Sequence, residues 1–282
     1  MPQHDPDAPD ALAAEWDIAP TPDELWGMLH AEAVRAANRE PVLGGLMALG
    51  VLRHPGFGAA LGALIARKLA DRSVPAEHLE DLARDALAGD PVALASATAD
   101  LAAIRARDPA SEGVLAPFLH YKGFHALQCH RVAHRLWRDG RRDLARFMQG
   151  RAAEVFAVDM HPAVPVGRGV FVDHGTGLVV GETATIGDDV SILQGVTLGG
   201  TGKECGDRHP KVRDGVLLSV GAKVLGNIEI GRGAKVGAGS VVLRDVPPCA
   251  TVAGVPARIV GWCKDSIPGL AMDQDLPARD GR

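Results

Sequence analysis

Three short segments of the chain place histidine beside acidic or basic residues. They are Asp159-Met160-His161-Pro162, Asp173-His174-Gly175-Thr176-Gly177 and Asp207-Arg208-His209-Pro210-Lys211. A histidine that is oriented by a carboxylate can take a proton from a hydroxyl group near neutral pH. One histidine beside glycine is more often a hydrogen-bonded structural residue, but three such clusters in one region favour acid–base chemistry or ligand binding.

The region around these segments repeats every six residues between positions 166 and 242. Branched aliphatic residues recur with this spacing at Ile186, Ile192, Leu198, Val212, Leu218, Val224, Ile230, Val236 and Val242. A fixed short period is typical of a parallel β-helix, in which each repeat supplies one short strand and a turn. We find one interruption, the loop that contains residues 207–211, and we therefore expect chemistry or binding in this loop.

The repeat also indicates which carboxylate serves His174. Asp173 is its neighbour in sequence, but adjacent side chains of an extended chain point to opposite faces. Asp159 lies 15 residues upstream, which is close to the roughly 18 residues of one β-helix coil, so stacked coils would bring it alongside. We expect His174 to be the general base and Asp159 to orient its imidazole.

The first half of the chain carries helical signals instead. Thr21-Pro22-Asp23-Glu24 is a capping box with proline at the first helical position, so a helix should begin there. Further helices are expected over about 76–88, 91–107, 117–139 and 141–156. The predicted fold class is α + β, with an α-helical domain over residues 21–156 and a β-helix catalytic domain over residues 157–262. Flexible segments are expected at residues 1–20 and 263–282.

Composition narrows the function classes. The net charge of −5 argues against nucleic acid as a partner, because there is no surplus of basic residues to neutralise phosphates. No apolar run approaches the roughly 20 residues of a membrane span, and the acidic N-terminus does not resemble a signal peptide, so we expect a cytoplasmic protein without a membrane partner. The scattered cysteines are expected to be free thiols in a reducing compartment: Cys129, Cys205, Cys249 and Cys263.

Two further features bear on ligands. His161, His174 and His209 could form a three-histidine zinc site, but the repeat region lacks the short His-x4-His pair of the hexapeptide-repeat carbonic anhydrases, so we expect no metal. The loop Gly199-Gly200-Thr201-Gly202-Lys203 lacks the spacing of a P-loop, yet its amides and Lys203 could hold a phosphate or a pantetheine chain. Glycine-rich turns at residues 221–223 and 237–240 are flat enough for an extended ligand, although tight corners need glycine in any case.

Over about residues 21–262 the chain resembles the serine O-acetyltransferase family. The motifs that carry the resemblance are Arg107-Asp108-Pro109-Ala110, the segments 121–128 and 158–162, Asp173-His174-Gly175-Thr176-Gly177, Gly181-Glu182-Thr183, and the segments 190–194, 197–203, 207–211 and 253–260. The hexapeptide pattern alone is shared by many acyltransferases. Its combination with the helical-domain motifs is specific.

The resemblance implies a left-handed β-helix and a reaction in which acetyl-CoA and L-serine give O-acetyl-L-serine and CoA, for cysteine biosynthesis. His174, held by Asp159, would deprotonate the serine hydroxyl, which attacks the thioester without a covalent acetyl-enzyme. The serine ammonium would contact Asp108 and Asp173, and its carboxylate would contact Arg208 and His209. Acetyl-CoA, a co-substrate and not a bound cofactor, would contact Thr201, Lys203, Ala222, Lys235 and Gly239.

The resemblance also implies assembly and regulation. Homotrimers would form through the β-helix and pair through the helical domain into hexamers, and L-cysteine would inhibit by occupying the serine site, since it differs by one heteroatom. Family members that bind cysteine synthase usually end in isoleucine. This chain ends Ala278-Arg279-Asp280-Gly281-Arg282, so we do not expect that complex. Gly175 replaces a common alanine, which should leave the backbone unchanged.

Two other functions stay open from the residues alone. Another hydroxyl acceptor, such as homoserine or a sugar, would use the same base, although a sugar offers no opposite charges to Asp108 and Arg208. A non-enzymatic scaffold would keep the fold but not the chemistry, and it predicts the loss of His174 and Asp159, both of which are present.

Overall fold

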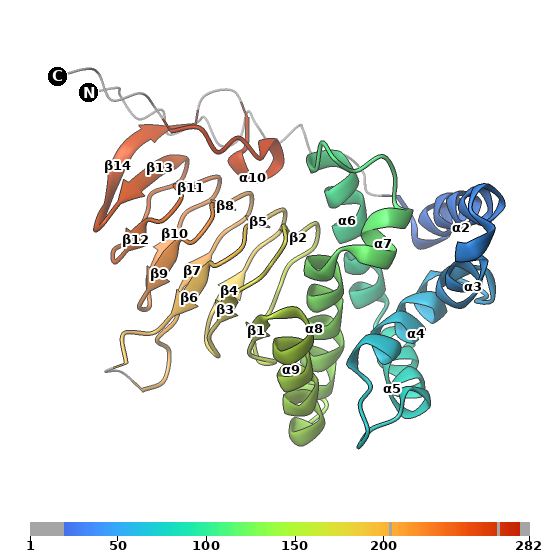
Figure 1. Cartoon of the computed structure of the whole chain (residues 1–282). Helices are drawn as coiled ribbons and strands as arrows, with labels where there is room; N and C mark the ends of the chain where they lie inside the picture. Colours follow the sequence, from blue (N-terminus) through green and yellow to red (C-terminus); the bar gives the residue numbers. More distant parts are fainter. Residues whose placement is uncertain (1–19, 203–204, 264–265, 277–282) are drawn as a thin grey trace. The chain divides into compact units, whose positions relative to one another are not determined.

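The protein consists of a helical unit and a β-helix unit (Figure 1). The computed structural model describes residues 20–202, 205–263 and 266–276. The helical unit comprises residues 19–163 and 174–176, and the β-helix unit comprises the described residues of 164–173 and 177–282. Residues 157–163 fall in the helical unit because β1 (Val158–Met160) packs on helix α9, and because His134 Nδ1 donates to the carbonyl oxygen of Pro162 at 2.7 Å. The domain boundary at residue 156 stays a prediction.

Helices fill the first unit. They are α2 (Pro22–Arg39), α3 (Gly44–Met47), α4 (Phe57–Leu69), α5 (Ala76–Ala88), α6 (Pro91–Arg107), α7 (Leu115–His120), α8 (Lys122–Arg138) and α9 (Arg142–Phe156), with a 3₁₀ turn η2 (Pro41–Leu43) and a π-helical turn η3 (Ala48–Leu52). The predicted capping box is confirmed, since Thr21 Oγ1 accepts the Glu24 N–H at 3.3 Å and Glu24 Oε2 accepts the Thr21 N–H at 2.8 Å. The predicted starts of α5 and α6 are also confirmed, and Asp90 caps α6 by accepting the Ala93 N–H.

The helix expected over residues 117–139 is instead two helices, because the chain leaves the helical conformation at Tyr121 (φ −81°, ψ 108°). Such a break leaves carbonyl groups without helical partners. The buried ring of His125 supplies one, as its Nε2 donates to the Phe118 carbonyl at 2.8 Å. The single-helix prediction failed because the signal for this break is a buried side-chain bond and not a glycine or proline.

A buried ion pair fixes α6 against α8. Asp100 is fully buried, and it accepts hydrogen bonds from Arg131 Nε at 2.8 Å and Arg131 Nη2 at 2.9 Å. Gln128 Nε2 donates to the same carboxylate at 2.9 Å. A bidentate pair of this kind sets the register of two helices, since any axial slip would strand a buried charge.

Short parallel strands build the second unit as a β-helix. They are β2 (Phe171–Val172), β3 (Leu178–Val180), β4 (Thr185–Ile186), β5 (Ser191–Ile192), β6 (Thr197–Gly199), β7 (Lys211–Val212), β8 (Leu217–Leu218), β9 (Lys223–Leu225), β10 (Glu229–Ile230), β11 (Lys235–Val236), β12 (Val241–Val242), β13 (Ala250–Gly254) and β14 (Ala257–Trp262). They stack as three sheets, one containing β3-β6-β9-β12, one β4-β7-β10 and one β2-β5-β8-β11-β13, to which β14 adds antiparallel. The predicted aliphatic residues point inward and are 0–4% exposed.

The strand register shows that the period is interrupted twice, not once as the sequence indicated. Val212 pairs with Ile230, 18 residues on, but Ile186 pairs with Val212, 26 residues on, so the loop before β7 inserts eight residues. Val172 pairs with Ile192, 20 residues on, so the turn between β2 and β3 inserts two more. Both insertions carry candidate site residues: the first contains residues 207–209, and the second contains residues 173–177.

Residues 266–276 cover the outer face of the sheet that contains β5 and β8, where the sequence led us to expect a flexible tail. Helix α10 (Pro268–Ala271) lies beside β8 (Figure 1). Ser191 Oγ donates to the Gly269 carbonyl at 2.6 Å, and the Gly269 N–H donates to the Gly215 carbonyl at 2.8 Å. The reason is that Phe171 and Leu217 sit on this outer face, and their burial requires a cover.

The cysteines are not all free. Cys249 and Cys263 form a disulfide that joins the ends of β13 and β14, so the expectation of free thiols is wrong for these two. Cys205 is exposed, and burial raises the pKa of the Cys129 thiol. Within the described residues no single helix is long and apolar enough to cross a membrane, and two bent pairs, Pro41–Leu52 with Phe57–Leu69 and Ala76–Ala88 with Pro91–Arg107, meet those criteria only together.

Candidate active site

The inserted loop of the β-helix unit is organised around Thr183. Its Oγ1 accepts the backbone N–H groups of Arg208 at 3.0 Å and of His209 at 3.1 Å. The same oxygen lies 2.9 Å from His209 Nδ1, and the Thr183 N–H donates to that nitrogen at 3.2 Å. Thr183 therefore holds both residues that the sequence assigned to the substrate carboxylate.

The charged groups of this loop are paired with one another. Arg208 Nη2 lies 3.0 Å from Glu182 Oε2, and Lys211 Nζ donates to Asp207 Oδ1 at 2.5 Å. The hydrogen bond from Lys211 lowers the pKa of the Asp207 carboxyl. An anionic ligand of Arg208 would therefore exchange with the Glu182 carboxylate.

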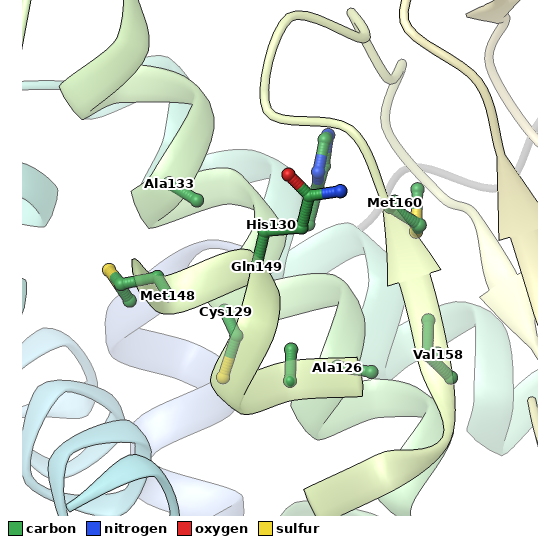
Figure 2. A pocket seen from close by; sticks show the side chains of 9 residues that line it. Ala126, Cys129, His130, Ala133, Met148, Gln149, Val158 and Met160 are labelled. Carbon is green, nitrogen blue, oxygen red and sulfur yellow. The ribbon is translucent and has the colours of Figure 1, made fainter. Parts of the chain in front are cut away.

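In the helical unit, Asp159 is exposed on β1 and is held by α9. Its Oδ1 accepts a hydrogen bond from Gln149 Nε2 at 2.7 Å. Gln149 also lines a pocket of about 230 Å³ between α8, α9 and β1, whose lining residues are mostly apolar (Figure 2). The packing of these elements therefore fixes the partner of Asp159, while its predicted role toward His174 stays a prediction.

His174 is exposed and stands at a left-handed backbone position, with φ 53°, followed by Gly175 at φ 74°. Non-glycine residues rarely adopt this conformation, and it occurs often at functional sites. Thr176 is anchored nearby by a hydrogen bond from Lys122 Nζ at the start of α8. The segment that carries the predicted base is thus bonded to α8 through Thr176, two residues after His174.

Asp108 terminates α6 and is half-buried. Its Oδ1 accepts the Ala110 N–H at 2.8 Å, which forms a local turn. Because α6 is locked to α8 through Asp100, the position of Asp108 is set by helix packing and not by a loose loop. Asp173 follows β2, where its N–H donates to the Ile192 carbonyl at 2.8 Å.

Glycine corners without side chains run along one edge of the β-helix. Gly177, Gly195, Gly221 and Gly239 all have φ between 67° and 78°. A Cβ on Gly195 would lie 3.5 Å from the Gly221 Cα, so the corners stack closely, and the Gly239 N–H donates to the Val220 carbonyl. Gly239, which is predicted to contact the cofactor, is exposed on this edge, whereas Ala222, also predicted to contact it, is fully buried.

The other predicted cofactor contacts are placed differently. Thr201 is exposed beside Gly226, and Lys203 lies outside the described residues. Lys235 is only 6% exposed, because residues 266–276 cover it and its Nζ donates to the Asp273 carbonyl at 2.8 Å. A cofactor contact at Lys235 would require this bond to open.

The residues that hold the site were missed by the sequence reasoning: Lys122, Gln149, Glu182 and Thr183. Lys122, Glu182 and Thr183 stand in motifs that carry the family resemblance, and this was the available signal. Of the three histidines considered for zinc, His161 contacts the Trp137 ring edge-on at 5.0 Å and His209 binds Thr183. Among the described residues no group of three possible metal ligands is found.

Comparisons with known proteins agree on one family. Residues 25–129 match the family model "Serine acetyltransferase, N-terminal". The serine acetyltransferase of Salmonella typhimurium is 54% identical over 250 residues, which cover 89% of this chain and 92% of that protein.

Solved structures give the same result over most of the chain. The serine acetyltransferase of Vibrio cholerae superposes with a TM-score of 0.88 at 50% identity, covering 89% of this chain and 98% of that one. A serine acetyltransferase in complex with cysteine gives 0.88 at 49% identity, covering 90% and 99%. Similar structures include a Brucella abortus enzyme with coenzyme A, at 48% identity, and a Neisseria gonorrhoeae enzyme with serine, at 49%.

Proposed function

This chain belongs to the serine acetyltransferase family, and from that premise we propose how its own residues carry out the reaction. Its fold is the left-handed parallel β-helix of that family, preceded by a helical domain. It transfers the acetyl group of acetyl-CoA to L-serine, and acetyl-CoA is a co-substrate.

His174 acts as the general base. Its imidazole takes the proton of the serine hydroxyl as the serine oxygen attacks the thioester carbonyl carbon. The C–S bond then breaks, and the departing CoA sulfur receives that proton, so no acetyl-enzyme forms. Asp159 orients the ring and stabilises its charged form, and the hydrogen bond from Gln149 holds Asp159 for this purpose.

The amino-acid substrate is held by charge at both ends. Asp108 and Asp173 bind its ammonium, while Arg208 and His209 bind its carboxylate. The Arg208–Glu182 ion pair supports this assignment, because it shows that the guanidinium can hold a carboxylate at 3.0 Å in this loop. Homoserine carries the same charges on a longer side chain, so the position of the base decides between the two acceptors.

Acetyl-CoA lies along the glycine corners. Gly239 offers a surface without a side chain to an extended pantetheine chain, and the small, buried Ala222 follows the neighbouring corner at Gly221. Thr201, Lys203 and Lys235 supply polar contacts. The absence of side chains at Gly195, Gly221 and Gly239 supports this path, because an extended chain can approach the backbone closely at a glycine.

The single observation that carries this mechanism is that the six-residue period is interrupted at the two places that hold the predicted base and the predicted carboxylate site. The test is thiol release from acetyl-CoA with L-serine, with L-homoserine and a simple sugar as parallel acceptors. Serine-dependent release well above both is expected. Release with homoserine alone would overturn the assignment of serine as the acceptor. No release with any of the three acceptors would favour a non-enzymatic scaffold.

His174→Ala supplies the mechanistic arm of this test. Turnover should fall roughly 100-fold or more, while the affinity for acetyl-CoA stays unchanged. Equal turnover in the variant and the parent would remove His174 as the base. Metal analysis of the active protein decides the zinc alternative, since zinc bound in stoichiometric amount would support it.

Regulation and assembly follow the same premise. L-Cysteine should compete with serine through the same ammonium and carboxylate contacts, and the protein should act in the cytoplasm as a homotrimer or a dimer of trimers. Inhibition that is competitive with serine, and a mass of three or six chains in solution, are the expected results.

A further inference from the structure

The hydroxyl oxygen of Thr183 has no lone pair left for a further donor. A threonine oxygen has two lone pairs and one hydrogen. Both lone pairs are used, since the N–H groups of Arg208 and His209 point at this oxygen at 3.0 and 3.1 Å. The oxygen therefore cannot accept a hydrogen bond from His209 Nδ1, which lies 2.9 Å away. Its own hydrogen can be donated to that nitrogen or to the Asp207 carboxylate, whose pKa a side-chain hydrogen bond with Thr183 helps to lower.

A second donor reaches the same ring nitrogen. The backbone N–H of Thr183 points at His209 Nδ1 at 3.2 Å. A hydrogen on Nδ1 would point at this N–H and at an oxygen with no free lone pair, so the nitrogen must present its own lone pair and carries no hydrogen. We propose that Thr183 is a positioning residue that fixes His209 as the neutral tautomer with its hydrogen on Nε2, so that the ring offers an Nε2–H donor to the amino-acid substrate. The ring state follows from the contacts alone, and the ligand rests on the proposed function.

The ring cannot satisfy these contacts in the flipped orientation. A half-turn about χ2 would exchange Nδ1 for Cδ2 and leave both Thr183 donors facing a carbon. The ring also lies close against the backbone of Gly181, where it fits only because this residue has no side chain. A Cβ at this position would lie 2.1 Å from both Cδ2 and Nε2 of His209. The ring is 7% exposed, so it has little room to move.

The charged neighbours are consistent with a neutral ring. Arg208 is paired with Glu182, and Lys211 is paired with Asp207. Lys211 Nζ also donates to the carbonyl oxygens of Thr183 at 2.6 Å and of His209 at 2.9 Å, which places a positive charge on this side of the ring. The two carboxylate-binding residues thus divide their roles, with Arg208 supplying charge and His209 supplying a neutral donor.

Neutron crystallography of the protein exchanged into heavy water near neutral pH tests the tautomer directly. A deuteron on Nε2 of His209 and none on Nδ1 is expected. A deuteron on Nδ1 would overturn the proposal. This readout needs no substrate, so it is independent of whether the acceptor is serine.

A matched pair of variants tests the role of the hydroxyl. Thr183→Ser keeps it and should leave the KM for serine within about twofold of the parent value. Thr183→Val keeps the shape but removes the donor and strands two N–H groups, so the KM for serine should rise roughly 10-fold, with the KM for acetyl-CoA unchanged.

The pH profile separates this role from a purely structural one. The parent KM for serine should be flat between about pH 6 and pH 8, while the valine variant should gain a dependence near the ordinary pKa of histidine. Identical KM values and profiles for the two variants would refute the proposal. If the valine variant does not fold, the neutron result still decides.

Discussion

His125 should make the helical domain sensitive to acid, and the size of the effect can be worked out from its surroundings. The ring is 2% exposed and lies between Phe124 and Phe156, with centroid distances of 6.2 and 5.9 Å. Its Nε2 donates to the Phe118 carbonyl, so an added proton must go to Nδ1. Burial, more than any other cause, lowers the pKa of His125 from 6.5 to about 4.

The sign follows from proton binding in the two states. Between pH 6.5 and pH 4 the unfolded chain binds a proton that the folded chain refuses, so stability is present above pH 6.5 and is lost as the pH falls through 4. Each pKa unit is worth about 1.4 kcal/mol, so the full loss is about 3 kcal/mol, of which about 2 kcal/mol falls between pH 7 and pH 5.

The assay is urea unfolding followed by far-ultraviolet circular dichroism, at fixed protein concentration and a series of pH values. His125→Gln removes the titrating ring but keeps a donor for Phe118. It should cost about 1 kcal/mol near neutral pH and should reduce the loss on going to pH 5 by about 2 kcal/mol. His78→Gln on the exposed surface of α5 is the control and should change neither. The reasoning is refuted if His125→Gln and the parent lose stability equally with acid.

Three further changes have expected outcomes. Asp108→Ala should raise both the KM for serine and the inhibition constant for cysteine, measured by steady-state kinetics. Unchanged values of both constants would contradict the proposed ammonium site. Asp100→Asn should lower the free energy of unfolding by about 3–5 kcal/mol because Arg131 would keep a buried, uncompensated charge, whereas Arg84→Ala, which removes an exposed ion pair, should cost under about 1 kcal/mol in the same assay. Ile267→Ser should cost about 2 kcal/mol and speed hydrogen exchange across residues 266–276, and unchanged exchange would contradict the docking of that segment.

The strands of the β-helix were predictable because each coil has the same packing requirement. Every strand must place one branched side chain inside a narrow core, so the period survives in the sequence as Ile186, Ile192 and their successors. The helix starts were predictable for a related reason, since the bonds at Thr21 and Asp90 join residues three positions apart. Such signals are local and can be read along the chain.

Features that depend on distant contacts could not be read in this way. The break at Tyr121 depends on His125 reaching back to Phe118, and the docking of residues 266–276 depends on Phe171 and Leu217 being on the outer face of a sheet. The two-residue insertion after Val172 was missed because glycine and small residues blur the period there. The pairing of Val172 with Ile192 on the next coil reveals the insertion, and such pairing between coils cannot be read from a single repeat.

The candidate site also combines features that can be read along the chain with features that depend on distant contacts. Its residue types were predicted from the chemistry of histidine beside carboxylate, and their catalytic roles remain predictions. The residues that hold them, Gln149 for Asp159 and Thr183 for His209, were not predicted because a polar side chain in a half-buried turn has many possible partners. Only the fold selects one.

The eight-residue insertion before β7 leaves the coils on both sides in step. Ile186 still stacks on Val212, and Ile192 on Leu218, as though the loop were absent. Loop length is therefore uncoupled from core packing at a β-helix corner. We therefore expect that corner segments with their reactive groups can be grafted between such solenoids without a change in the interior of the host.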